Sequence, residues 1–102
     1  MKFFRGNTFF KVIHSETYTF QKGDKLHIVV MKNAYSDKYL YEEIKEIQAE
    51  TNEIEFEILP EKTAQFPIGK LLLEIELTTK DGIVETNQYD LEVEADGIHG
   101  KN

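Results

Sequence analysis

The sequence has no cysteine, no long apolar run and no excess of basic charge. Without cysteine the chain cannot build a disulfide scaffold, a thiol nucleophile or a Cys-ligated zinc site. No segment approaches the roughly 20 apolar residues of a membrane span or the roughly 7–15 of a signal peptide. A net charge of −7 opposes duplex binding, which needs clustered Lys and Arg. We therefore expect no membrane or nucleic-acid partner and a start in the cytoplasm of the producing cell.

Recognisable catalytic and metal-binding motifs are also missing. His14, His27 and His99 are separated by 13 and 72 positions, which matches no metal-ligand spacing. There is no Gly-rich phosphate loop, no G-x-S-x-G and no H-E-x-x-H. The prediction is a protein that is not an enzyme, with no catalytic residue, no cofactor and no metal.

The length of 102 residues suits one domain of ordinary composition, with 40% hydrophobic residues. Charge is unevenly placed along it. Residues 1–38 hold seven Lys/Arg and three acids, a net of +4, whereas residues 39–102 hold five Lys and sixteen acids, a net of −11. Because the basic region of one copy attracts the acidic region of another, the charge pattern also points to pairing between copies of the chain as a homo-oligomer.

An alternation of period two dominates the second half. Residues 53–58 place Ile54, Phe56 and Ile58 on one face and three glutamates on the other, which is typical of a half-buried strand. Residues 69–95 show two further alternating runs joined by Asp81-Gly82, which favours a long antiparallel hairpin.

The first half is β-rich but less regular. Strands are expected at residues 8–13, 18–20 and 26–31. Residues 39–49 stay open between helix, favoured by Leu40, Ile44 and Ile47 at helical spacing, and strand, favoured by the surrounding β pattern. Pro60 predicts a short helical turn at residues 60–64. Together these signals predict an all-β antiparallel sandwich of about seven strands over residues 1–95, followed by a flexible C-terminal tail, 96–102.

The strand glutamates admit two interpretations. Glu53, Glu55 and Glu57 share one strand face, and the pairs Glu74/Glu76 and Glu92/Glu94 share others. A calcium site needs 6–8 converging oxygens, whereas carboxylates two apart on a strand run parallel. A solvated outer face that keeps the sheet soluble is the favoured interpretation, and a basic partner would relieve repulsion between these like charges.

Aromatic residues gather in the first half and supply the best signal for an interaction surface. In each adjacent pair on a strand one member must face away from the core, and an exposed Phe indicates a contact surface. The candidate contact residues are Phe3, Phe4, Phe9 and Phe10. A sugar-binding platform would instead use exposed tyrosines, for which Tyr35, Tyr39 and Tyr41 are candidates.

The order of several short motifs resembles a known family. These motifs are Arg5-Gly6-Asn7-Thr8-Phe9, Phe20-x-Lys22-Gly23-Asp24-x-Leu26, Pro60-Glu61-Lys62-Thr63-Ala64 and Phe66-Pro67-x-Gly69-Lys70. Over about residues 3–95 the chain is similar to small Ig-like β-sandwich structural proteins of tailed bacteriophages and prophages, which include the N-terminal domain of the baseplate upper protein. The resemblance implies an Ig-like sandwich without an active site, and it favours strand at residues 39–48.

From this resemblance we expect a structural protein of a phage or prophage particle, in the tail, baseplate or head–tail region. It would be found in the bacterial host cytoplasm during assembly and in the virion, with other phage structural proteins as partners. The apolar anchors would be Phe3, Phe4 and one of the pair Phe9 and Phe10, and the electrostatic contacts would be Glu53, Glu55 and Glu57. A carbohydrate or cell-surface binding module using Tyr35, Tyr39 and Tyr41 is the alternative, and an acidic regulator that mimics nucleic acid is a weaker one.

Overall fold

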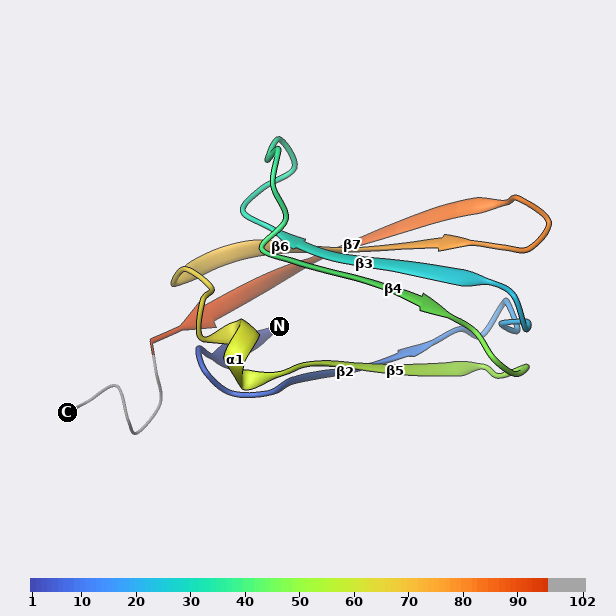
Figure 1. Cartoon of the computed structure of the whole chain (residues 1–102), viewed down its shortest axis with the longest axis horizontal. Helices are drawn as coiled ribbons and strands as arrows, with labels where there is room; N and C mark the ends of the chain where they lie inside the picture. Colours follow the sequence, from blue (N-terminus) through green and yellow to red (C-terminus); the bar gives the residue numbers. More distant parts are fainter. Residues whose placement is uncertain (96–102) are drawn as a thin grey trace.

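The computed structural model describes residues 1–95; the predicted tail and His99 lie outside the described residues. In this part the chain forms seven strands and one short helix (Figure 1). In order, they are β1 (Lys2–Phe4), β2 (Phe9–His14), β3 (Lys25–Met31), β4 (Tyr41–Glu46), β5 (Glu53–Ile58), α1 (Pro60–Thr63), β6 (Gly69–Thr78) and β7 (Val84–Glu94). The all-β prediction and the helical turn at Pro60 are confirmed.

The strands form two sheets. A five-stranded sheet has the order β1-β7-β6-β3-β4, and β2 pairs with β5 in a separate two-stranded sheet. Figure 1 shows the β2–β5 pair facing the larger sheet, with α1 at one end. Every pairing is antiparallel except that of β1 with β7. The prediction of a purely antiparallel arrangement is therefore wrong at β1, a three-residue strand that the sequence pattern did not indicate and that runs alongside the last residues of β7.

The core lies between the two sheets. It consists of inward-facing side chains, which alternate with outward-facing ones along the strands. Ile54, Phe56 and Ile58 of β5 point inward, as predicted. The larger sheet contributes the alternate residues of β3, β6 and β7, and Phe66 closes the end beside α1. The fully buried aliphatic side chains that the larger sheet contributes to this core are Leu26, Ile28, Val30, Leu73, Leu91 and Val93. Burying this apolar surface is the main free energy that favours the fold.

Residues 39–49 contain a strand rather than a helix. β4 pairs with β3 along its whole length, from Tyr41 to Glu46. Ile44 consequently faces solvent on the outside of the sheet, whereas Ile47, just beyond the strand, is buried in the core. The helical spacing of the apolar residues was overridden by tertiary pairing, which commonly decides such short segments.

The strand expected at residues 18–20 is wrong. Only Phe20 pairs there, through an isolated bridge to Thr51. The Tyr18 hydroxyl donates to the Asp24 carboxylate at 2.6 Å, and the backbone N–H of Gln21 donates to the same carboxylate at 2.9 Å. These local bonds to a side-chain acceptor tie the segment to the turn at Lys22-Gly23 and compete with a regular ladder.

The hairpin predicted over residues 69–95 is confirmed, and its second strand begins earlier than the alternating pattern indicated. β6 and β7 pair from Gly69–Val93 to Thr78–Val84. Gly82 in the connecting loop has φ +89, a conformation that glycine adopts without steric cost. The first residues of β7 are exposed on both faces, so no alternation marked them in the sequence.

Candidate functional site

The outer surface of the small sheet brings together two sets of residues that the sequence proposed separately. β2 and β5 pair so that Phe10 lies opposite Glu57, Val12 opposite Glu55 and His14 opposite Glu53. All six side chains are on the face that points away from the core, because their neighbours Phe9, Phe56 and Ile58 point inward. We call this surface the Phe10 face, defined by Phe10, Val12, His14, Glu53, Glu55 and Glu57.

The Phe10 face combines an exposed apolar row with an acidic row. Phe10 is 56% exposed and Val12 41% exposed. His14 Nδ1 lies 3.6 Å from Glu53 Oε1, whereas the carboxylates of Glu55 and Glu57 have no ion-pair partner within residues 1–95. Large apolar side chains and unpaired carboxylates side by side are the chemistry of a contact surface for a partner that carries both apolar and basic groups.

Phenylalanine pairs split between core and surface as the strand periodicity requires. Phe9 is buried and its ring lies 6.2 Å from that of Phe56, while Phe10 faces outward. On β1, Phe3 packs against Phe9 at 5.1 Å between ring centroids, and Phe4 is exposed on the larger sheet. Phe10 and Phe4 are therefore the accessible members, and they lie on different sheets.

The tyrosines do not form a single platform. Tyr35 is 93% exposed in the loop between β3 and β4. Tyr39 instead lies edge-on against His27, with ring centroids 5.9 Å apart. Tyr41 points to the inner side of β4, where burial and a hydrogen bond from its hydroxyl to the Glu43 carboxylate raise its pKa to about 12. The three rings thus lie in three different settings.

A second acidic surface lies on the outside of the larger sheet. Glu74 and Glu76 of β6 share this face with Glu92 and Glu94 of β7, and Lys2 lies 3.5 Å from Glu92. On β3, His27 Nε2 is 2.6 Å from Glu42 Oε2 of β4. Within residues 1–95 no group of three or more His, Cys, Asp or Glu side chains is arranged to hold a metal ion.

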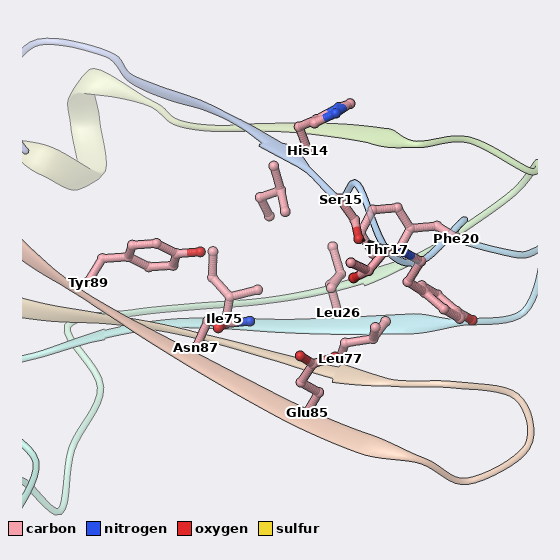
Figure 2. Close-up of a pocket in the computed structure, with 12 residues that line it drawn as sticks. His14, Ser15, Thr17, Phe20, Leu26, Ile75, Leu77, Glu85, Asn87 and Tyr89 are labelled. Atoms are coloured by element: carbon pink, nitrogen blue, oxygen red, sulfur yellow. Dashed lines mark hydrogen bonds between the residues drawn. The ribbon is translucent and has the colours of Figure 1, made fainter.

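A cleft of about 220 Å³ opens between β2 and the β6–β7 hairpin (Figure 2). Ile75 and Leu77 of β6 lie at its apolar floor, and polar groups of Ser15, Glu85 and Asn87 lie around it. This volume is below the roughly 300–1,000 Å³ of sites for drug-sized ligands. The cleft is suited to a side chain or a very small molecule.

Lys11 is a residue that the sequence reasoning passed over. It belongs to the inward-facing set of β2, and its Nζ lies 4.5 Å from the centre of the Tyr89 ring on β7. Its position between two apolar inward residues, Phe9 and Ile13, was the available signal. A charge on the inner side of an edge strand discourages unwanted pairing at that edge.

No protein-family model, curated protein or solved structure matches this chain. Among the described residues no helix has the length and apolar character of a membrane span.

Proposed function

We propose that this protein is a small non-enzymatic assembly module that binds another protein through the Phe10 face. The observation that carries the proposal is the β2–β5 register, which sets Phe10 opposite Glu57 and Val12 opposite Glu55. An apolar anchor with a carboxylate beside it suits a partner surface in which an apolar pocket is bordered by Lys or Arg. The apolar contact supplies affinity, and the charges supply orientation and a faster encounter.

The setting proposed for these contacts is a phage or prophage particle, with other structural proteins of the particle as partners. The support for this setting, and for an Ig-like arrangement of the strands, is the resemblance carried by the motifs of residues 3–95. Two opposed sheets are compatible with an Ig-like sandwich. A carbohydrate-binding role is less well supported, because Tyr35, Tyr39 and Tyr41 are dispersed.

Co-expression with the products of the neighbouring genes, followed by affinity capture at low and high salt, tests the proposal. Each captured partner is then purified and its Kd measured. The test variants are Phe10→Ala and the triple variant Glu53→Gln/Glu55→Gln/Glu57→Gln. The matched control is Glu16→Gln/Glu50→Gln/Glu61→Gln, which removes the same charge from exposed positions outside the face.

We expect Phe10→Ala to weaken binding by at least about tenfold, as truncation of an anchor residue does. The Glu53/Glu55/Glu57 variant should weaken binding and flatten its salt dependence, because exposed charges are screened by salt. The control triple variant should bind like the original protein. Equal binding by all of these proteins would overturn the proposed role of the Phe10 face.

A further inference from the structure

Resting on the proposed role of the Phe10 face, we infer that its partner is a second copy of this chain, which binds through the loop between β3 and β4. We call residues 32–40 the β3–β4 loop. Among the large hydrophobic side chains of residues 1–95, the most exposed is Tyr35 of this loop, at 93%. A ring this exposed is a strong candidate for a contact residue, because tyrosine is enriched among the residues that dominate protein interfaces.

Hydrogen bonds within the loop hold Tyr35 on an ordered turn. Asn33 Oδ1 accepts from the N–H of Tyr35 at 2.9 Å, and the N–H of Ser36 donates to Asn33 O at 3.2 Å. Ser36 Oγ in turn accepts from the N–H of Asn33 at 3.1 Å. The backbone around Tyr35 is therefore ordered before a partner arrives, which lowers the entropy lost when the ring is buried in a contact.

A shallow hollow of about 320 Å³ lies in the same loop, with two lysines beside it. Its lining residues are Lys32, Ser36, Asp37, Lys38 and Leu40. Lys32 and Lys38 are exposed, and neither has an ion-pair partner within residues 1–95. Because lysine stems are apolar, they form an apolar wall with Leu40 while their ammonium groups stay at the rim. Asp37 offsets one of the two positive charges.

This hollow complements the Phe10 face in both shape and charge. Phe10 is 56% exposed and lies opposite Glu57, so a ring inserted into the hollow brings that carboxylate to the lysine rim. The Tyr35 ring then lies toward Val12, the next exposed apolar residue of the face. Glu55, opposite Val12, supplies a second carboxylate. The apolar contacts supply affinity, and the ion pairs fix the orientation.

The β3–β4 loop and the Phe10 face lie on opposite sides of the molecule. Figure 1 shows the loop standing away from the larger sheet, on the side opposite to the β2–β5 pair. A chain cannot bring its own loop onto its own face, so the contact joins two copies. Because the two surfaces differ, each pair keeps one free loop and one free face. Further copies therefore add head to tail, into a ring or an open chain.

The acidic surface on the outside of the larger sheet is a poorer site for the loop. Lys2 lies 3.5 Å from Glu92 and 3.8 Å from Glu94. The Glu74 carboxylate accepts from the Gln88 side chain at 2.9 Å. These carboxylates already have partners, whereas two carboxylates of the Phe10 face have no ion-pair partner within residues 1–95.

Sedimentation of two variants, separately and mixed, tests the inference, because a head-to-tail contact needs one intact loop and one intact face on different copies. The loop variant is Lys32→Glu/Tyr35→Ala/Lys38→Glu, and the face variant is Phe10→Ala/Glu55→Gln/Glu57→Gln. Each alone should self-associate at least about tenfold more weakly than the unmodified protein. Mixed, they should form a complex of one copy of each that grows no further. Circular dichroism checks that both variants fold.

The matched control for the loop variant is Lys22→Glu/Lys62→Glu. It reverses the same number of charges at exposed lysines outside the loop, so it carries the same gain in negative charge. This control should self-associate like the unmodified protein. Added salt should weaken self-association of the unmodified protein, because exposed ion pairs are screened.

A mixture of the loop and face variants that stays monomeric would overturn the inference. So would an unmodified protein that sediments as a monomer at about 1 mM in low salt, or a loop variant that self-associates as well as the unmodified protein. The proposed function fails separately. If Phe10→Ala abolishes capture of a different protein while the chain stays monomeric, the face is correct and the second copy is not its partner.

Discussion

The carboxylate of Asp24 accepts a hydrogen bond from the backbone N–H of Lys80 at 3.0 Å, although the two residues are 56 positions apart. The same carboxylate accepts from the Tyr18 hydroxyl and from the backbone N–H of Gln21. Asp24 is fully buried, and it joins the turn before β3 to the tip of the β6–β7 hairpin. Its three donors make burial of the charged group favourable.

Replacement of Asp24 by Asn should destabilise the protein by about 2–4 kcal/mol. The amide would present an N–H₂ group to donors that need an acceptor, and it would lose the charge that strengthens all three bonds. The free energy of unfolding in urea measures the effect. Asp81→Asn is the matched control, because Asp81 is an exposed residue of the same hairpin loop, and its substitution should change stability by less than about 0.5 kcal/mol.

Because of the hydrogen bonds to the Asp24 carboxylate, the free energy of unfolding should fall at both acidic and alkaline pH. Burial acts to raise the pKa of Asp24, but the hydrogen bonds from Tyr18, Gln21 and Lys80 outweigh it and hold the pKa below its ordinary 3.8. The contribution of Asp24 is therefore complete above pH 3.8 and is lost as the pH falls through the lower folded value. In Asp24→Asn, most of this loss of stability at acidic pH should disappear.

At alkaline pH the dependence is reversed, and stability falls as the pH rises. The hydrogen bond to Asp24, with burial, raises the pKa of Tyr18 from 10.0 to about 12. The folded state then keeps a proton that the unfolded state loses, so stability falls between pH 10 and 12. Tyr18→Phe should reduce this loss in urea titrations at pH 9 and 11, and Tyr41, with a pKa also near 12, should account for part of the remainder. An unchanged slope in Tyr18→Phe would contradict the assignment.

Adjacent phenylalanines should respond very differently to truncation. Phe9→Ala removes a ring buried among Phe3 and Phe56, and it should cost about 3–5 kcal/mol of unfolding free energy. Phe10→Ala should change stability by less than about 0.5 kcal/mol, because that ring faces solvent. Thermal and urea unfolding of both variants provide the measurement. A large loss in Phe10→Ala would mean that its ring packs within the monomer.

Thr63 should matter through its hydroxyl rather than its volume. It is fully buried, and its Oγ1 donates to Asn7 O at 2.7 Å, which ties α1 to the turn between β1 and β2. Thr63→Val keeps the shape and removes the donor, so we expect a loss of about 1–3 kcal/mol. Thr63→Ser retains the hydroxyl and should be the milder change. The reverse order in urea unfolding would show that the methyl group dominates.

Strands could be predicted well from the sequence wherever one face of the strand is buried and the other is exposed to solvent. β5 and β6 followed from this alternation, because burial on one side imposes a period of two. β1 and the start of β7 did not follow. β1 is too short to show a period, and Val84 to Gln88 are exposed on both faces, so neither segment carries a hydrophobic pattern.

The outward-facing residues of the candidate site could be predicted from the sequence, but the pairing that sets them opposite one another could not. Alternation alone placed Glu53, Glu55 and Glu57 on one outer face, and it required one ring of each Phe pair to be exposed. That Phe10 lies opposite Glu57 depends on the pairing of β2 with β5, two strands distant in sequence. Pairing across such a separation is decided by packing of the whole core, which local patterns do not encode.

Gly82 offers a test of backbone conformation without side-chain interference. Its φ is +89, and a Cβ built there would have no neighbour within 4 Å, so any cost of substitution comes from the backbone alone. Gly82→Ala should destabilise the protein by about 1–2 kcal/mol, and Gly82→Asn by less, because Asn tolerates positive φ better. Urea unfolding of the two variants gives the comparison. Equal stability of Ala and Gly at this position would mean that the loop relaxes to negative φ, and the hydrogen bond from Gly82 N to Thr79 O, 2.9 Å long, would then be expected to break.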